Sequence, residues 1–386
     1  MFLRRRWSLP FAILVCTAIA SPAFGDDPAA ARPRSAPPVI HSSWDDLLSG
    51  VKTADDWQRH RQQLKQRYLD LIRDNQKPAQ KPPLDLQVHE DKVIDNAYHR
   101  LLISYNVEAD ERAHAYLGLP LGAKGKLPAV VALHGTYPQG IRQEAGLEPN
   151  QKKLYDNAYL DQMCRRGYVV IAPEHFVSGH RIPPEGPYET NRFYEKHPEW
   201  TAVGKFTYEH SIAIDVLETR DDVDRANIGA MGHSLGGHGT FFLAAYDDRI
   251  KAAVSNCGAG SLRHNSGVEN WARDHWYIYF KHIRPQLLAG QLPPIDIHEI
   301  ISLIAPRAYL DVSALNDGDP LMQRQHVLML LKIADVYQLV GKPENFAFFV
   351  HGRGHSVPHE SRELIYGFLD AQLKPSEVTR TRPVSE

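Results

Sequence analysis

The stretch NIGAMGHSLGGHGTFFLAAYDDRIKAAV, residues 227–254, decides the fold. It joins an apolar, strand-like run to a helix-like run through the pentapeptide GHSLG, which has Ser234 at its centre. A serine at a sharp strand-to-helix turn has a strained backbone, and its neighbours two positions away must be small so that strand and helix can approach each other. Gly232 and Gly236 meet this requirement. The pattern predicts a nucleophilic Ser234, and a glycine-rich loop with an incidental serine is the alternative.

Strand-like and helix-like runs alternate through most of the chain. Such alternation predicts a parallel sheet covered by helices on both faces, and nearly continuous apolar strands are typical of it. We therefore predict an α/β fold with a mostly parallel, eight-stranded sheet. The strand-like runs are RLLISYNVE, HAYLGLPLG, LPAVVALHG, GYVVIAPEH, NIGAMGH, IKAAVSNCG, RAYLDVSAL and NFAFFVHG. The helices expected among the later strands cover residues 151–166, 207–220, 237–246, 321–340 and 360–373.

The N-terminal region has the pattern of an export signal. Three arginines precede an apolar run and then the small residues of SPAFG, so we predict a signal peptide over residues 1–25, cut after Gly25, and a secreted or periplasmic protein. An uncleaved anchor is the alternative. Residues 26–42 are rich in Ala, Pro and Arg and are predicted to be a disordered leader. Residues 43–85 form the predicted helical extension, with Ser43 or Thr53 as its N-cap.

Charge and cysteine content exclude several classes of protein. Cleavage would remove three arginines and no acid, which takes the net charge from −2 to −5, so no nucleic-acid partner is indicated. No later segment has the ~20 apolar residues that a membrane span needs. Cys16 would leave with the signal. Cys164 and Cys257 remain, and we expect them to be free, buried thiols because their predicted local structures do not suggest a pair.

The catalytic domain is predicted to cover residues 86–374, before a polar tail at 375–386. Cap-like insertions near 176–206 and 258–298 follow two of the strands, on the side where loops overhang the nucleophile. The second insertion is rich in aromatic residues, namely Trp271, Trp276, Tyr277, Tyr279 and Phe280. A sugar-stacking platform is one interpretation, and the apolar underside of a cap is the favoured one.

A serine nucleophile requires a histidine base and an acid that orients the histidine. His355 lies in a glycine-flanked loop after the last strand, whereas its neighbour His351 is expected to pack at the strand end. Asp317 follows the preceding strand, where such folds carry the acid. Asp319 is expected to cap the next helix, and Asp311 lies too deep in its strand. A solvated turn is the alternative interpretation of the two later aspartates.

The oxyanion that forms during acyl transfer requires two hydrogen-bond donors. The backbone N–H of Leu235 is the first candidate. The second is the backbone N–H of Thr136, in the loop after the third strand-like run, LPAVVALHG. His175, His180, His233 and His238 show no spacing that completes a metal shell, so no metal and no cofactor are predicted. His233 and His238 flank the serine and are expected to pack around it.

The segments LHG, GHSLGG, IAPRAYLDVSALND and GHS, in this order, resemble the α/β-hydrolase superfamily over roughly residues 101–373. The segment YEHSIAIDVLETRDDVDRANIGAMGHSLGG and the IAPR motif resemble its dienelactone hydrolase and acetyl xylan esterase branch, as does the helical extension. Some members of that branch have a cysteine nucleophile, where this chain has Ser234. The resemblance implies cleavage of carboxylic esters, often acyl groups on plant polysaccharides.

The predicted function is thus that of an exported serine ester hydrolase acting on a small-molecule or polysaccharide ester. Three alternatives remain. A peptidase of the prolyl-oligopeptidase type shares the triad order but usually carries a propeller, for which this chain is too short. An acyltransferase would use the same residues. A non-catalytic binding protein on the same scaffold would be expected to have lost a triad member, and all three positions are filled.

Overall fold

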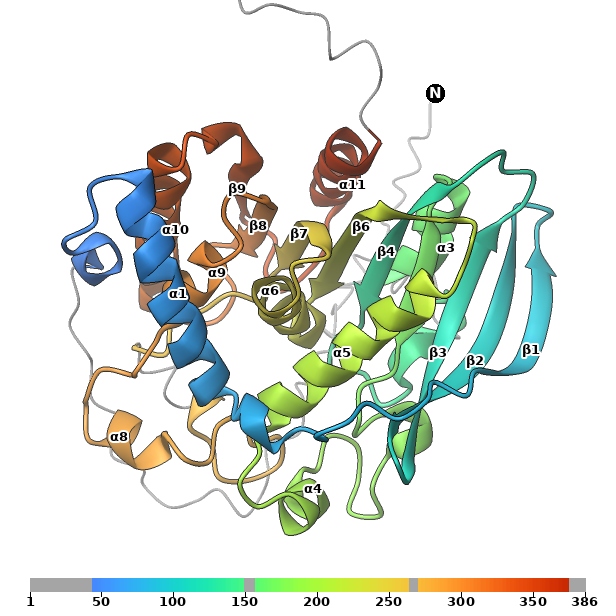
Figure 1. Cartoon of the computed structure of the whole chain (residues 1–386), viewed down its shortest axis with the longest axis horizontal. Coiled ribbons are helices and arrows are strands. Elements are labelled where there is room, and N and C mark those ends of the chain that lie inside the picture. Colours follow the sequence, from blue (N-terminus) through green and yellow to red (C-terminus); the bar gives the residue numbers. More distant parts are fainter. Residues whose placement is uncertain (1–43, 149–156, 264–269, 375–386) are drawn as a thin grey trace, which may run out of the picture. The chain divides into compact units, whose positions relative to one another are not determined.

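The computed structural model describes residues 44–148, 157–263 and 270–374, which belong to one compact unit (Figure 1). The predicted signal peptide, the leader and the polar tail lie outside the described residues. In the part that is described, no helix has the length and apolar character needed to cross a membrane.

The described residues form a sheet of nine strands in the order β1-β2-β3-β5-β4-β6-β7-β8-β9. Strands β1 to β3 pair antiparallel, as do β3 and β5, and the remaining neighbours are parallel. The strands are β1 (Gln87–Ile94), β2 (Tyr98–Glu108), β3 (Glu111–Pro120), β4 (Leu127–Leu133), β5 (Val169–Pro173), β6 (Val223–His233), β7 (Ile250–Asn256), β8 (Ala308–Ala314) and β9 (Phe346–His351). The predicted α/β class and mostly parallel sheet are confirmed.

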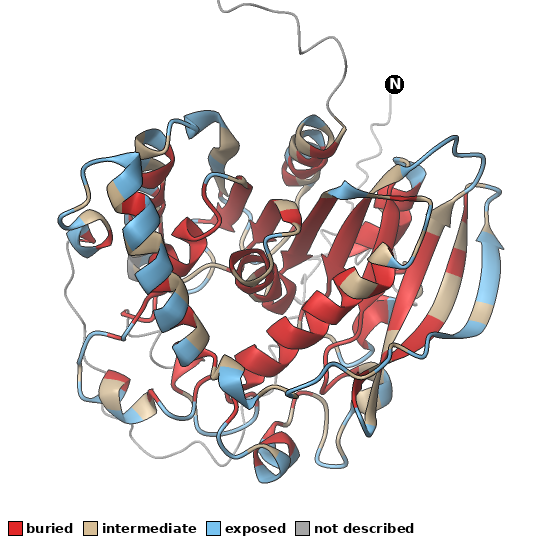
Figure 2. Cartoon of the chain, in the orientation of Figure 1, coloured by how far each residue is buried: buried red, intermediate tan, exposed pale blue. Residues whose placement is uncertain are grey.

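The prediction of eight strands is wrong by one, because β1 was missed. This strand has the sequence QVHEDKVI and forms the edge of the sheet, where six of its eight residues are exposed (Figure 2). A strand that pairs on one side only and buries little has no need of apolar residues, so it lacks the hydrophobic signal that marks the central strands.

Helices cover both faces of the sheet, because the central strands bury side chains on both sides. In β4, Val131 and Leu133 belong to one hydrophobic cluster, and Val130 and Ala132 belong to the other. Helices α1, α5, α6, α9 and α10 contribute to the first cluster, and α3 and α11 contribute to the second. The α-helices are α1 (Ala54–Leu71), α3 (Tyr159–Arg165), α4 (Asn191–Lys196), α5 (Ala202–Glu218), α6 (Leu235–Tyr246), α8 (Arg284–Leu288), α9 (Ile297–Ser302), α10 (Pro320–Leu339) and α11 (His359–Leu373).

Short 3₁₀ helices complete the described secondary structure. They are η2 (Asp45–Leu48), η3 (Asp74–Gln76), η4 (Gly140–Arg142), η6 (Gly179–Arg181) and η7 (Pro343–Asn345). The predicted helical extension contains η2, α1 and η3. Two N-caps were predicted for the extension. Thr53 is confirmed, because it caps α1 in a reciprocal capping box with Asp56. The other candidate, Ser43, lies outside the described residues.

The extension packs against the catalytic part of the fold. The Tyr68 hydroxyl in α1 donates a 2.7 Å hydrogen bond to the carbonyl of Phe242 in α6, and Arg61 donates to the carbonyl of Leu303. Helix α1 therefore contacts α6, the helix that starts directly after Ser234. The carboxyl ends of the parallel strands β4, β6, β8 and β9 lie at the same end of the sheet, which brings the loops that follow them together.

Candidate active site

Ser234 lies in the tight turn between β6 and α6. Its φ is 58° and its ψ is −120°, which is a strained conformation for a residue with a side chain. A Cβ on Gly232 would overlap the carbonyl oxygen of Gly236, and a Cβ on Gly236 would overlap that of Leu133. The predicted need for small residues on both sides of the serine is therefore confirmed.

His355 and Asp317 are hydrogen-bonded to each other. His355 Nδ1 lies 2.7 Å from Asp317 Oδ2, between the loop after β9 and the loop after β8. The imidazole of His355 also contacts that of His233, with 4.6 Å between the ring centroids. Because His233 directly precedes Ser234, this contact holds the His355 ring beside the turn that carries the serine.

The residues considered as alternatives to His355 and Asp317 form other hydrogen bonds. His351 is the last residue of β9, is buried, and its Nδ1 accepts a hydrogen bond from the N–H of Arg353. Asp311 lies inside β8 and is bonded to His326 at 2.9 Å. The carbonyl of Asp319 accepts a hydrogen bond from Gln323 in the first turn of α10, as expected for a residue at a helix start.

Two backbone N–H groups are available next to Ser234. Those of Thr136 and Leu235 donate no hydrogen bond within the described residues. The N–H of Tyr137, the next residue in the loop, donates to the carbonyl of Gly135 at 2.8 Å. Thr136 thus has a backbone N–H without a partner in the described structure, and its role as oxyanion donor stays a prediction.

Buried groups that the sequence analysis missed hold this loop in place. The hydroxyl of Tyr188, from the first insertion, donates to the carbonyls of Gly135 and Tyr137 at 3.1 and 2.8 Å. His134 Nδ1 lies 2.7 Å from the Gly135 carbonyl oxygen, and its Nε2 accepts from the N–H of His175. Since these partners come from loops far apart in sequence, no local spacing could have indicated them.

A cavity of about 280 Å³ brings the predicted site residues together. It is lined by Ser234, His355 and Asp317, and also by Thr136 and Leu235. The remaining wall includes Cys257, His238, Asn270, Trp271, Arg273, Trp276, Tyr277, Tyr279, Met322 and Gln323.

Most aromatic residues of the second insertion are buried, and most of them also line the cavity. Trp271, Tyr277, Tyr279 and Phe280 are buried, as the underside of a cap would be, whereas Trp276 is 38% exposed. Except for Phe280, these residues also line the cavity. The guanidinium of Arg273 lies over the rings of Trp276 and Tyr279, so the wall offers flat apolar surfaces beside a cationic donor.

Of the two histidines that flank the serine, His233 is buried, and His238 is partly buried and lines the cavity. His233 Nδ1 is 3.0 Å from Asn256 Oδ1, and His238 Nδ1 is 3.3 Å from the hydroxyl of Tyr279. Burial lowers the pKa of each histidine to about 3, so both imidazoles are neutral near pH 7. The predicted packing of these residues around the serine is confirmed.

Among the residues that the structure describes, three groups of side chains have ligand atoms close enough together to suggest a metal. They are His114, Glu174 and His180; Cys257, Asp317 and His355; and Asp46, His298 and Glu299. In the second group, burial raises the pKa of the Cys257 thiol, which disfavours the thiolate that a metal would require. Both predicted thiols are free, but Cys257 is only partly buried, since it faces the cavity.

The chain has an α/β-hydrolase fold, as the order of its strands and the turn at Ser234 indicate. A family model described as "Glucuronyl esterase, fungi" matches residues 184–341, which include Ser234 and Asp317. Among solved structures, the glucuronoyl esterase from Solibacter usitatus has a TM-score of 0.66 to this chain at 19% identity, covering 90% of this chain and 100% of that one. The last likeness concerns the fold alone.

Two proteins are similar in sequence. YtaP of Bacillus subtilis (strain 168), which is named as a hydrolase, is 28% identical over 244 residues, or 63% of this chain and 76% of YtaP. Carbohydrate esterase MZ0003, from an unknown prokaryotic organism, is 29% identical over 143 residues, or 34% of this chain and 33% of that protein. The relatives thus include a hydrolase and a carbohydrate esterase.

Proposed function

We propose that this protein is a serine hydrolase of carboxylic esters, with Ser234 as nucleophile, His355 as general base and acid, and Asp317 as the acid that orients His355. The observation that carries this proposal is the cavity that joins these three side chains to two backbone N–H groups without partners in the described structure. Nucleophile, base and oxyanion donors around one space are the requirements of acyl transfer.

In this mechanism Ser234 Oγ attacks the carbonyl carbon of the ester, and His355 Nε2 accepts the hydroxyl proton. Asp317 accepts the hydrogen bond from His355 Nδ1–H, which fixes the tautomer and stabilises the imidazolium. The N–H groups of Thr136 and Leu235 bind the oxyanion. His355 then protonates the leaving alcohol, and water, deprotonated by the same histidine, releases the acid from the serine.

We propose a carbohydrate ester as the substrate, with a uronic acid sugar on the acyl side as the first candidate. The match to the glucuronyl esterase model and the named carbohydrate esterase support this choice. The cavity wall agrees with it, since Trp271, Trp276 and Tyr279 offer rings for a sugar face. Arg273 offers planar donors for sugar oxygens or for the carboxylate product.

The mechanism is tested by the variant Ser234→Ala. The variant should fold like the wild type and lose turnover of p-nitrophenyl acetate by at least about 10⁴-fold. A fluorophosphonate should label the wild type once per chain and leave the variant unlabelled. Hydrolysis at near wild-type rate by Ser234→Ala would refute the assignment of the nucleophile.

The substrate is tested by comparing kcat/KM for a benzyl ester of glucuronic acid, acetylated xylan, a feruloyl sugar ester and an aminoacyl anilide. We expect the highest value for the glucuronate ester. A higher value for acetylated xylan would overturn the uronate assignment and leave the serine mechanism intact. Product analysis with added methanol distinguishes hydrolysis from acyl transfer to an alcohol.

We also propose export, because a polysaccharide ester is met outside the cytoplasm and the first 25 residues have the pattern of a signal peptide. N-terminal sequencing of protein recovered from the periplasm or medium should give a start near Asp26. An intact Met1 on that protein would contradict cleavage.

A further inference from the structure

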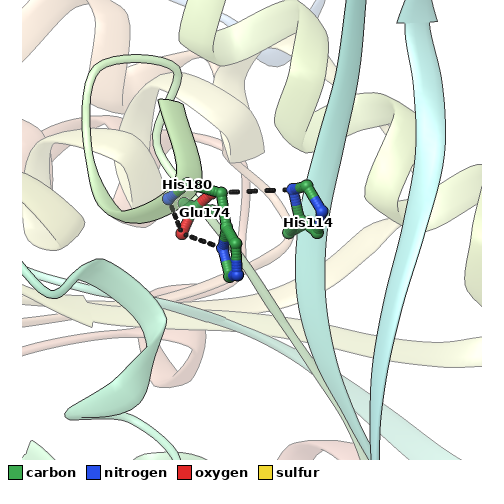
Figure 3. A group of neighbouring side chains, drawn as sticks. All are labelled: His114, Glu174 and His180. Atoms are coloured by element: carbon green, nitrogen blue, oxygen red, sulfur yellow. Dashed lines mark hydrogen bonds and ion pairs between the residues drawn. The ribbon is translucent and has the colours of Figure 1, made fainter. Parts of the chain in front are cut away.

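A second cluster of reactive side chains lies outside the cavity. Strands β3 and β5 pair antiparallel with Ala115 opposite Pro173, which brings His114 in β3 beside Glu174, the residue after β5. Glu174 Oε1 accepts hydrogen bonds from the backbone N–H and the Nδ1 of His180, at 3.0 and 3.1 Å. Both imidazoles are turned toward the same carboxylate (Figure 3).

Two polar atoms at the centre of this cluster have no hydrogen-bond partner in the described structure. They are Glu174 Oε2 and His114 Nδ1, which face each other at 4.0 Å. The side chain of Glu174 is 0% exposed, so the carboxylate has lost its water on that side. Leaving a buried carboxylate oxygen and a buried imidazole nitrogen without a partner is costly, and one cation between them would satisfy both.

We propose that His114, Glu174 and His180 bind a divalent transition-metal ion of the zinc type. Zinc takes nitrogen and oxygen ligands at ~2.0–2.2 Å in a tetrahedral arrangement, so two of its ligand atoms lie ~3.4 Å apart. Glu174 Oε2 and His114 Nδ1 are 4.0 Å apart and would move together by about 0.6 Å when the ion binds. Two imidazoles and one carboxylate favour zinc over calcium or magnesium, which prefer oxygen ligands alone.

The surroundings are fitted to the carboxylate. Gly179 has a φ of 52°, and a Cβ at this position would overlap Glu174 Oε1, so the glycine leaves room for the carboxylate. Arg181 donates a hydrogen bond to the backbone carbonyl of Glu174. Its positive charge is balanced by ion pairs with Glu111 and Glu209, so it repels a nearby cation only weakly.

The two histidines are in different states before metal binding. Burial lowers the pKa of His114 to about 4, so this imidazole is neutral and ready to bind a metal near pH 7. The hydrogen bond to Glu174 raises the pKa of His180.

The site would brace the loop that carries Thr136. The N–H of Gly179 donates a 3.0 Å hydrogen bond to the carbonyl of Pro138, two residues beyond Thr136. An ion fixed by Glu174 and His180 would hold the segment around Gly179 and, through it, this loop. The ion's role would be structural, because none of its three ligands lines the cavity at Ser234.

The test uses the untagged full chain after removal of metals with a chelator. Zinc is added in competition with a chromophoric chelator, and the melting temperature is followed. The variant His180→Ala changes a half-exposed residue of the short 3₁₀ helix η6, so we expect it to fold. His99→Ala is the matched control, because His99 forms a histidine–carboxylate pair with Asp91 on the neighbouring strands.

We expect the wild type and His99→Ala to bind one zinc ion with the same affinity and to melt at a higher temperature with zinc. His180→Ala should bind at least about tenfold more weakly and lose that shift. Cobalt should give the visible bands of a low-coordinate site in the wild type and lose them in His180→Ala. Equal zinc affinity for the wild type and His180→Ala would overturn the proposal, as would a wild type that binds no zinc.

Discussion

Asp317 Oδ2 and His355 Nδ1 lie 2.7 Å apart although 38 residues separate them in sequence. The pairing arises because β8 and β9 are parallel neighbours, so the loops that follow them leave the sheet at the same edge. Asp317 is 23% exposed and His355 is 46% exposed in their side chains, which leaves the imidazole open to a substrate.

This pairing distinguishes the two aspartates in the loop after β8. Asp317→Asn should keep the fold and lower kcat by roughly 10⁴-fold, because the amide favours the wrong tautomer of His355. Asp319→Asn, the matched control, should keep most of the activity, since Asn and Asp serve equally well at a helix start. Ester hydrolysis by both variants, measured with circular dichroism as a check of folding, decides the assignment. A larger loss at Asp319 would refute it.

The turn at Ser234 depends on glycine at position 236. In Gly236→Ala the new Cβ would overlap the carbonyl of Leu133, so the turn must shift and the variant should melt at a lower temperature and lose activity. Gly367, an exposed glycine in α11 with open space around it, is the matched control. Gly367→Ala should stabilise the protein by about 0.5–1 kcal/mol without changing kcat. An active, unshifted Gly236→Ala would contradict the close packing at the turn.

The sequence predicted those features that depend on residues close together in the chain. Glycines on both sides of Ser234 indicated the turn, and polar turn residues after apolar strands indicated Asp317 and His355. The alternation of strands and helices predicted the sheet. These features depend on backbone conformation and on the succession of strands along the chain, and both leave a pattern in short stretches of sequence.

What the sequence did not reveal depends on contacts between distant segments. The edge strand β1 is polar because it is exposed, so no hydrophobic period marks it. Tyr188 reaches the loop at Thr136 from an insertion without regular spacing. His114 and Glu174 meet only through the pairing of β3 with β5, and a search for ligands spaced along the chain cannot find such a pair.

Stability should fall between pH 6.5 and 5. Burial lowers the pKa of His210, His233 and His238 to about 3 in the folded state, whereas an unfolded histidine titrates near ~6.5. Below ~6.5 the unfolded chain binds protons that the folded chain excludes, so the stabilisation present above that pH is lost as pH falls. His180, whose pKa is raised, acts in the opposite direction.

Urea unfolding at pH 7.5, 6.0 and 5.0 measures this effect. Each excluded proton contributes up to ~1.4 kcal/mol per pH unit, so three histidines give a steep decline even if their effect is only partial. Carboxylates with lowered pKa values add to the loss only below ~4.5. A free energy of unfolding that stays constant from pH 7.5 to 5.0 would show that these histidines are not excluded from protonation.

Tyr188 is expected to position the oxyanion donor of Thr136. Its hydroxyl fixes the carbonyls of Gly135 and Tyr137, which are on either side of that donor, and both carbonyls keep another N–H donor when the hydroxyl is removed. Tyr188→Phe should therefore fold, with a loss of about 1 kcal/mol in the free energy of unfolding. A loosened donor should lower kcat about tenfold, less than the ~10²–10³ that follows deletion of a donor.

The matched control is Tyr194→Phe. Tyr194 is also buried in the first insertion, but its hydroxyl donates to the carbonyl of Ile278 and does not touch the loop at Thr136. Tyr194→Phe should lose at least as much stability, because the N–H of Ala202 also loses its acceptor, and only Tyr188→Phe should lose kcat. KM should stay near the wild-type value, because an oxyanion donor acts on the charge that develops in the transition state and contributes little to ground-state binding. Equal kcat values for the two variants would mean that the Tyr188 hydroxyl stabilises the fold and does not position Thr136.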